Sequence, residues 1–548
     1  MKDTKNGHPK SNILNKIRNI PESLRQYRQT NKDEIGIISA MLCFGILLAV
    51  IIQEKISVER FLGGFLLISI ILFLFYKDIK RYKPVYQKNH KMLFLLGILI
   101  TTTLLFSRFF AYLNEALQRG LNLPDGSSYL FGIPIPFGAM LVTLIFDFHT
   151  AIIFSFVVSL IIGIWVNEPL YMLYGLIGSL TAAFCAINCK KRSSLIKGGF
   201  YVSAVNIITV VIIHLIKEDF FSPSAFPAIF FAASSGIIAA AIVLIILPLI
   251  EYIFGVTTDI SLVELLDLEH PLMHNLMINA PGTYHHSVIV ANLAGSAAEA
   301  VGANPLLARV SAHYHDIGKI KMPEYFVENQ TGTISKHEKL TPHMSSMIIT
   351  SHVKEGIELA KQHKLPSVVI DILRQHHGTT SIAYFYQKAK EQATDLPPMP
   401  EDYRYHGPKP QTRVAALVMM ADAVEAASRS LIDPTPARIS ALVEKIINNI
   451  FLDGQIDECE LTLKDLSEIK KRFTHILTII FHKRIAYPES TEKGWHQKRQ
   501  KLTFSSESKT FADQDTQILA SAKDDGDPDN KQPKIDKDKP SEDKTASK

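Results

Sequence analysis

Cysteine is scarce in this chain, since only four of the 548 residues are cysteine and no two of them form a CxxC pair. Cys43, Cys185 and Cys189 lie in or beside apolar segments, and Cys459 lies in the more polar second half. This usage argues against a framework of disulfide bonds. The chain therefore suits a reducing compartment.

Charged residues are also scarce between positions 35 and 254, where long apolar runs alternate with short gaps. A transmembrane helix needs roughly 20 mostly apolar residues. Eight segments meet this need, and they are centred on 35–53, 61–76, 92–113, 129–146, 151–166, 170–188, 198–215 and 225–254. The fourth contains Ile133-Pro134-Ile135-Pro136. We expect it to be bent, because proline removes backbone donors.

The distribution of Lys and Arg predicts the orientation of these spans. Basic residues are concentrated in residues 1–34 and in the gaps 77–91 and 189–197, whereas the intervening gaps are short and not notably basic. The positive-inside rule then places both termini in the cytosol, as an even number of spans requires. The first apolar run begins late and is long enough to span, which argues against a cleaved signal peptide. The net charge of +5 comes largely from these segments, so no nucleic-acid partner is expected.

The composition predicts four regions: a basic cytosolic segment 1–34, a membrane domain 35–254, a soluble domain 259–490 and a charged tail 491–548. The tail is low in apolar residues and dotted with proline, so we expect it to be disordered. The soluble domain has apolar residues at helical spacing in 261–277, 286–302, 305–316, 342–362, 367–378, 412–430, 436–451 and 463–483. The expected fold is all-α: a polytopic helical membrane domain followed by a cytosolic all-helical bundle.

Histidines and aspartates recur at the ends or on one face of these soluble helices. An isolated pair such as His315-Asp316 is usually no more than a hydrogen-bonded helix end. Several such points can instead converge to form a metal site inside a helical bundle. Imidazole combined with carboxylate favours a transition metal. The candidates are His285, His286, His315, Asp316, His352, His376, His377 and Asp422.

Several motifs of the soluble domain resemble known enzymes. "HHS...VANLA", "YHDIGK", "SH", "QHHG" and "ADAVEA", in this order, resemble the HD-domain metallophosphohydrolases. "PGTYHHSVIVANLA", "ENQ", "QHHGTT" and "DGQIDECELTLKDL" are similar, more narrowly, to the seven-transmembrane HD hydrolase family, whose PgpH-type members hydrolyse cyclic di-AMP. The resemblance implies an all-helical HD-domain bundle over the soluble domain.

The resemblance also implies two divalent transition-metal ions, Mn or Fe. The first would be held by His286, His315, Asp316 and Asp422, and the second by Asp316, His352, His376 and His377. Asp316 would therefore bridge the two ions. His285 is the less favoured ligand of its pair. His313 lies two residues before His315, on a different side of the helix, and is expected to be structural.

Other residues near the ligands are candidates for catalysis and substrate binding. Lys319 would place an ammonium near the developing negative charge, alongside the catalytic Asp316; a solvated lysine is the alternative. Substrate-binding candidates are Thr379, Thr380, Tyr384 and Tyr386, with helix-packing aromatics as the alternative for the tyrosines.

The resemblance implies a membrane-anchored phosphodiesterase that hydrolyses cyclic di-AMP to linear pApA. Cyclic di-GMP phosphodiesterases of the HD-GYP type carry a GYP element after their paired histidines, whereas "HHGTTSIAYFYQKA" follows here. The alternatives are an HD hydrolase for another nucleotide (cyclic di-GMP, (p)ppGpp or a dNTP) and a non-catalytic nucleotide-binding membrane receptor. Expected partners are a cyclic dinucleotide and the lipid bilayer, and a homodimer stays open.

The chain departs from the family pattern in one respect. Typical members have a large extracellular domain after the first span, whereas here only "EKISVE" separates Gln53 from the next span. The catalytic interpretation does not depend on that domain.

Overall fold

The computed structural model describes residues 22–53, 57–84, 86, 89–123, 127–330, 335–393 and 397–482, and describes side chains from residue 34 onward. The expectations for the first 21 residues and for the tail 491–548 lie outside these residues. The predicted end of the soluble domain at residue 490 does so as well.

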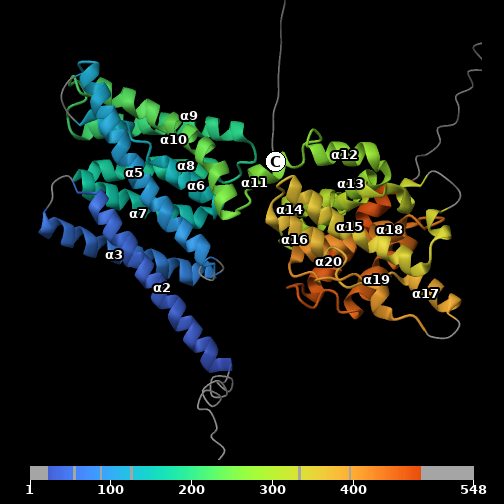
Figure 1. The fold of residues 1–548 in the computed structure, drawn as a ribbon. Coiled ribbons are helices and arrows are strands. Elements are labelled where there is room, and N and C mark those ends of the chain that lie inside the picture. The colour runs from blue at the N-terminus through green and yellow to red at the C-terminus, as the bar shows by residue number, and fades with distance from the viewer. Residues whose placement is uncertain are drawn as a thin grey trace, which may run out of the picture. The chain divides into compact units, whose positions relative to one another are not determined.

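The first half of the chain forms long apolar helices, as predicted. They are α2 (Glu22–Ile51), α3 (Val58–Tyr82), α5 (His90–Gly120), α6 (Pro136–Ile145), α7 (Phe148–Val166), α8 (Pro169–Ala186), α9 (Arg192–Ile216) and α10 (Ala225–Phe254) (Figure 1). Within the described residues, eight segments are long and apolar enough to cross a membrane. Several helices extend beyond the predicted apolar runs. For example, α3 continues through Lys80 and Arg81. A helix does not have to end where its apolar stretch ends.

The fourth span is broken rather than merely bent. A short 3-10 helix, η1 (Ser128–Gly132), precedes the break, and α6 begins afterwards at Pro136. A break inside a membrane frees backbone carbonyls that no water can satisfy. The hydroxyls of Tyr171 and Tyr174 donate hydrogen bonds to the carbonyls of Leu130 and Phe131. The two tyrosines of α8 thus compensate for the break.

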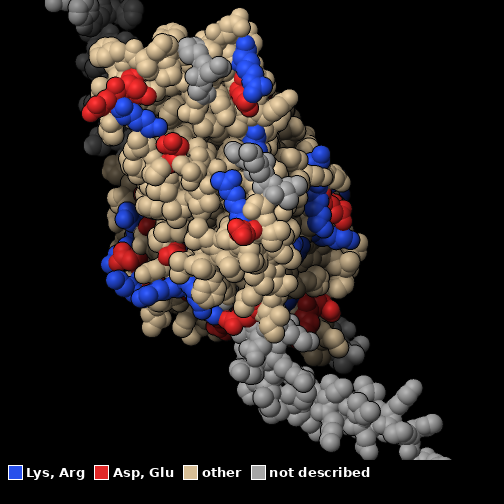
Figure 2. All heavy atoms as spheres, turned by 90° about the vertical axis from the view of Figure 1, so that its left-hand side faces the viewer, with Lys and Arg blue, Asp and Glu red and all other residues tan. Residues whose placement is uncertain are grey.

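Large apolar side chains lie on the outer surface of these helices. Leu66, Ile70, Leu74, Phe109 and Phe184 are all exposed. The face in Figure 2 is mostly uncharged, with acidic and basic side chains interspersed. Exposed apolar area on this scale requires a lipid environment. The chain is therefore a multi-pass membrane protein.

The second half of the chain forms a bundle of shorter helices. They are α11 (Asp259–Glu264), α12 (Pro271–Asn279), α13 (Pro281–Ala300), α14 (Pro305–Tyr314), α15 (Pro342–Gln362), α16 (Ser367–Gln375), α17 (Ala383–Gln392), α18 (Arg413–Ser428), α19 (Pro436–Leu452) and α20 (Leu463–Ile480). Short 3-10 turns lie at Ile317–Lys321, Pro323–Tyr325, Val327–Asn329, Lys336–Lys339 and Pro400–Tyr403. Outside the masked segments, β pairing is limited to an isolated bridge between Ser381 and Arg404. The all-α prediction is confirmed.

Two details of the bundle differ from the predicted helices. The segment 261–277 forms two helices, because Pro271 begins α12 and proline is poorly tolerated inside a helix. Helix α17 was not among the predicted segments. Gly302 and Gly378 end helices as expected, with φ of +67° and +52°, in the left-handed region that glycine adopts readily.

The core of the bundle surrounds α18. Residues Val414 to Asp422 of this helix are all buried, and they pack with apolar residues of α13, α19 and α20 such as Val290, Ile447 and Phe473. A helix that is apolar on all sides lies in the centre of its domain. Asp422 is therefore held in the interior, as the sequence indicated.

The distribution of basic residues leads to a topology prediction. We expect reporter fusions at Lys191 and within the soluble bundle to report the cytosol, and a fusion at Pro223, between α9 and α10, to report the outside. The equivalent test at Lys88 concerns a position outside the described residues. An external soluble bundle would contradict an even number of spans with both ends in the cytosol.

Candidate metal centre

Five helices of the bundle bring the predicted ligands together. Helices α13, α15 and α18 contribute ligands from within their length, and the ends of α14 and α16 contribute the rest (Figure 1). Two groups result: His286, His315, Asp316 and Asp422; and Asp316, His352, His376 and His377. Within each group the donor atoms lie within 4.8 Å of one another. Asp316 is common to both groups.

The two oxygens of Asp316 face different groups. Oδ2 lies 3.2 Å from Nε2 of His315 and 3.6 Å from Nε2 of His286. Oδ1 lies 3.3 Å from Nε2 of His352 and 3.8 Å from Nε2 of His376. This is the arrangement that a carboxylate bridging two cations would require.

Gly318 permits the turn that carries Asp316. After α14 the chain enters the 3-10 turn η2 (Ile317–Lys321), which packs directly against α15. A Cβ on Gly318 would lie only 1.8 Å from the carbonyl oxygen of His352. Only glycine therefore allows Asp316 and His352 to approach each other with this backbone.

Three of the histidines are oriented by the backbone. His315, His352 and His376 each place Nδ1 at 2.7, 2.6 and 2.6 Å, respectively, from the carbonyl oxygen of the residue three positions earlier. A carbonyl oxygen only accepts, so Nδ1 carries the hydrogen in each ring. Nε2 then presents its lone pair to the centre. Ligating histidines are commonly oriented in this way.

This arrangement fits a metal cation. Nε2 of His352 and Nε2 of His376 lie 3.3 Å apart. Burial lowers the pKa of both rings, so two lone pairs face each other. Across the described residues, Nε2 of His315 and Oδ1 of Asp316 make no hydrogen bond although both are buried. A cation between these atoms would satisfy all of them.

The charges of the residues in the two groups also fit a metal cation. Burial opposes protonation of His315, yet neighbouring Asp316 raises its pKa to about 10. Burial likewise opposes protonation of His286, and Asp422 outweighs it, so the pKa of His286 is raised. Burial lowers the pKa of His377 to about 3. The carboxylates thus favour positive charge at His315 and His286, which a metal cation could supply in place of the protons, while His377 is neutral and offers a lone pair.

Lys319 contacts the carboxylate of Asp316 directly. Its Nζ lies 2.7 Å from Oδ2 of Asp316 and 2.8 Å from Oε1 of Glu328, and 5.0 Å from the centre of the Phe326 ring. The side chain is 13% exposed, so Lys319 is not a solvated lysine. Burial opposes its charge, but Asp316 raises its pKa. Glu328 in turn accepts a hydrogen bond from Thr283 of α13 at 3.0 Å.

Comparison with family models identifies both halves of the chain. Residues 58–258 match the 7TM receptor with intracellular HD hydrolase, and residues 283–427 match the HD domain. The chain belongs to this family of membrane HD hydrolases. The resemblance stated from the motifs is thereby confirmed.

Two curated relatives share much of the sequence. The cyclic-di-AMP phosphodiesterase PgpH of Bacillus subtilis is 39% identical over 369 residues, which are 66% of this chain and 52% of the relative. Its namesake in Listeria monocytogenes is 38% identical over 451 residues, or 81% of this chain and 61% of the relative. The chain thus spans between half and two thirds of the length of these relatives.

The HD domain of the L. monocytogenes phosphodiesterase PgpH has also been solved in complex with cyclic di-AMP. It is 50% identical and is covered completely, corresponding to 40% of this chain, with a TM-score of 0.38. A second crystal structure of that domain is 48% identical, with 39% of this chain and all of that chain covered and a TM-score of 0.37.

Glu425 contacts a candidate metal ligand, His286, and was not predicted. Its Oε2 makes a short hydrogen bond with Nδ1 of His286, and its Oε1 accepts from Nε of Arg429 at 2.8 Å. Glu425 lies three residues after Asp422, and that spacing places both carboxylates on one face of α18. This spacing was the available signal in "ADAVEA".

His377 lies between the two groups. Its Nδ1 is 3.5 Å from Oδ2 of Asp422, and its ring stacks on Tyr405 with centroids 4.1 Å apart. Tyr405 was not predicted, because it approaches through a loop that follows α17 by more than ten residues. His285, the less favoured member of its pair, is exposed while His286 is buried, and His313 is in neither group.

The predicted substrate-binding residues lie beside the site in sequence but contact other parts of the bundle. Thr379 N and Oγ1 bond the side-chain amide of Gln455. Thr380 Oγ1 donates to the carbonyl of His377 at 2.8 Å. Tyr384 is 70% exposed, and Tyr386 packs against Tyr403. Their role in binding stays a prediction.

A groove of about 360 Å³ adjoins the candidate metal ligands, and His377 and Tyr405 are part of its lining. Three basic side chains and one acidic side chain also line it: Lys354, Lys361, Arg374 and Glu358. The excess of basic side chains attracts anions into the groove.

The contact between Glu425 and His286 leads to a test of metal affinity. We expect Glu425→Gln to weaken metal binding roughly 10- to 100-fold, because the residues that orient metal ligands typically have effects of that size. Metal content of the purified full-length protein, measured after dialysis against a metal buffer, would show it. Glu299→Gln, at an exposed position of α13, is the matched control. Equal retention of metal by both variants would exclude a role for Glu425 in orienting His286.

Proposed function

We propose that this protein is a membrane-anchored, metal-dependent phosphodiesterase that hydrolyses cyclic di-AMP to linear pApA. The proposal rests above all on Asp316, whose two oxygens face two groups of buried imidazole and carboxylate donors. A non-catalytic receptor would need no such complete set of ligands.

The ligands suit two transition-metal ions, with Mn or Fe as the proposed metals. His286, His315, Asp316 and Asp422 would hold one ion, and Asp316, His352, His376 and His377 the other. Two bound ions would supply Lewis acidity for the phosphodiester and for a water molecule. A magnesium site would instead be built mainly from oxygen ligands and water.

The protein's own residues have distinct roles in this proposal. Asp316 holds the two halves of the site together, and the backbone carbonyls keep the imidazoles aimed at the centre. Lys319, fixed between Asp316 and Glu328, keeps an ammonium beside the place where negative charge develops on the phosphate oxygens. The buried ligands also exclude bulk water, which strengthens these electrostatic interactions.

The groove next to His377 suits an anionic dinucleotide. Lys354, Lys361 and Arg374 would attract its phosphates, and the ring of Tyr405 offers an aromatic surface. The names of the two curated relatives, cyclic-di-AMP phosphodiesterase, support this substrate in particular. The proposed location is the cytosolic face of the cell membrane, where a cytosolic second messenger would be accessible.

Bridging by Asp316 leads to a test of hydrolysis. We expect Asp316→Ala to lose metal and nearly all hydrolysis of cyclic di-AMP, because the cations would lose the one carboxylate that both share. His313→Ala, in the same helical segment but in neither ligand group, should keep most activity. Hydrolysis, metal content and circular dichroism of the full-length protein should be measured together. Substantial turnover by a folded Asp316→Ala protein would refute the proposed bridge.

The number and type of metal ions give a separate prediction. Elemental analysis of the active full-length protein should find close to two transition-metal ions per chain, one for each ligand group. A single tightly bound zinc would contradict the bridging role of Asp316. Assay of the same sample with cyclic di-AMP, cyclic di-GMP, (p)ppGpp and dNTPs tests the substrate, since preferred hydrolysis of any of the last three would refute cyclic di-AMP.

A further inference from the structure

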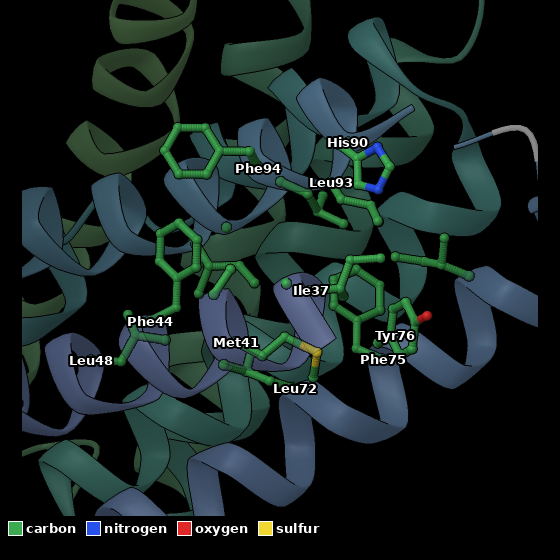
Figure 3. A pocket seen from close by; sticks show the side chains of 16 residues that line it. Ile37, Met41, Phe44, Leu48, Leu72, Phe75, Tyr76, His90, Leu93 and Phe94 are labelled. Atoms are coloured by element: carbon green, nitrogen blue, oxygen red, sulfur yellow. The ribbon is translucent and has the colours of Figure 1, made fainter. Parts of the chain in front are cut away.

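A second cavity lies among the membrane helices α2, α3 and α5 (Figure 3). Its volume is about 360 Å³, within the range of roughly 300–1,000 Å³ that is typical of small-molecule sites. Most of its lining is apolar, including Met41, Phe44, Leu72, Leu93 and Phe94. None of these side chains belongs to the metal centre. The cavity therefore requires an explanation of its own.

One end of the cavity is polar. Tyr76 and His90 lie towards the same end, whereas Phe44 and Leu48 lie towards the opposite end (Figure 3). Tyr76 is only 7% exposed, and its hydroxyl has no hydrogen-bond partner within the part of the chain that the structure describes. A buried hydroxyl without a partner is costly. A ligand with a polar group at this end would satisfy it.

The length of the cavity matches one leaflet of a bilayer. On α2 the lining runs from Gly36 to Leu48, and on α5 from His90 to Ile100. At a rise of about 1.5 Å per residue these stretches are about 18 and 15 Å long. Half of the roughly 30 Å hydrocarbon core is about 15 Å. An acyl chain of one leaflet therefore fits along the helices.

Basic side chains gather at the polar end. Helix α3 ends there with Lys80 and Arg81, and α5 begins with His90 and Lys91. Lys80 lies one helical turn beyond Tyr76 and makes an ion pair with Glu34 of α2. Lys77 and Lys83 add further positive charge, so the basic side chains here outnumber the acidic ones. Lys83 pairs with Asp147 at 3.4 Å, and Asp78 of α3 lies 3.1 Å from His149. The charge at this end therefore suits an anionic headgroup.

We propose that this cavity is a binding site for one anionic phospholipid. Its acyl chain would lie between α2, α3 and α5, its phosphate beside the basic ends of α3 and α5, and a headgroup or ester oxygen would accept from the Tyr76 hydroxyl. The site is separate from the metal centre, so it adds a lipid ligand to the proposed phosphodiesterase. This assignment rests on the length of the apolar lining and on the positive charge at the polar end of the cavity.

Gly36 allows the cavity to be filled without disturbing its walls. A Cβ at Gly36 would meet no atom within 4 Å, so Gly36→Leu can place its side chain in the open space. Gly63 of α3 also has no atom within 4 Å of its Cβ, but it does not line the cavity. Gly63→Leu is therefore a matched control for the added side chain in a membrane helix.

The test is native mass spectrometry of the full-length protein with phosphatidylglycerol or phosphatidylcholine added to the detergent solution. The parent protein and Gly63→Leu should retain one phosphatidylglycerol per chain at concentrations where phosphatidylcholine is lost. Gly36→Leu should weaken this binding roughly tenfold, because about two methylene groups of the acyl chain would be displaced. Tyr76→Phe should weaken it about fivefold, which is the loss of one hydrogen bond.

Three outcomes would overturn the proposal. Equal retention of the two lipids would indicate ordinary annular lipid without preference for an anionic headgroup. Parent-like binding by Gly36→Leu would place the lipid elsewhere. A change of oligomeric state in Gly36→Leu with unchanged lipid binding would indicate that a second copy of the chain occupies the groove. Thermal unfolding of each variant establishes that the proteins compared are folded.

Discussion

The candidate metal centre depends on the placement of one carboxylate, Asp316, between imidazoles from different helices. Burying an isolated carboxylate is costly, and here it is surrounded by His315 and His352 and paired with Lys319. Each of these contacts requires a particular packing of α14 against α15, with Gly318 at the point of closest approach. The bundle can therefore be understood as the scaffold that makes this costly burial tolerable. Without the negative charge of Asp316, the surrounding imidazoles and Lys319 would lose the group with which they interact.

Two of the imidazoles, those of His315 and His376, are held in place by the ends of the helices that precede them. His315 and His376 directly follow α14 and α16, where carbonyls of the last turn have no intrahelical partner. Their Nδ1 atoms take up carbonyls of that turn. One hydrogen bond thus satisfies a carbonyl of the last helical turn and selects the tautomer that leaves Nε2 free. A helix end therefore suits His315 and His376 as candidate ligands.

The sequence predicted much of the fold but fewer of the residues that hold the candidate ligands in place. Span lengths and apolar content are properties of local sequence, so the eight spans followed from them, and the break at Ile133-Pro134-Ile135 was signalled by proline. The ligand groups were predicted through the HD motifs, since no spacing alone shows that His286 and Asp422 meet. Glu425 depends on a contact between α13 and α18 that local patterns do not encode. The cavity beside Tyr76 forms because α2, α3 and α5 leave space between them, and local sequence does not show how closely three helices pack.

Some buried polar groups of this chain are paired within the protein and others are not, and the chemistry around the unpaired groups indicates which ligand would suit each. In the broken fourth span, the carbonyls of Leu130 and Phe131 are satisfied by tyrosine hydroxyls of the protein itself, so that break requires no ligand. Nε2 of His315, Oδ1 of Asp316 and, separately, the hydroxyl of Tyr76 make no hydrogen bond within the described part of the protein. Folding would not favour such buried atoms without compensation. The first set lies among imidazoles and carboxylates, which suit cations; the second lies at the polar end of an apolar cavity near lysines, which suits an amphipathic anion. The chemistry around each unsatisfied atom thus distinguishes the two kinds of ligand.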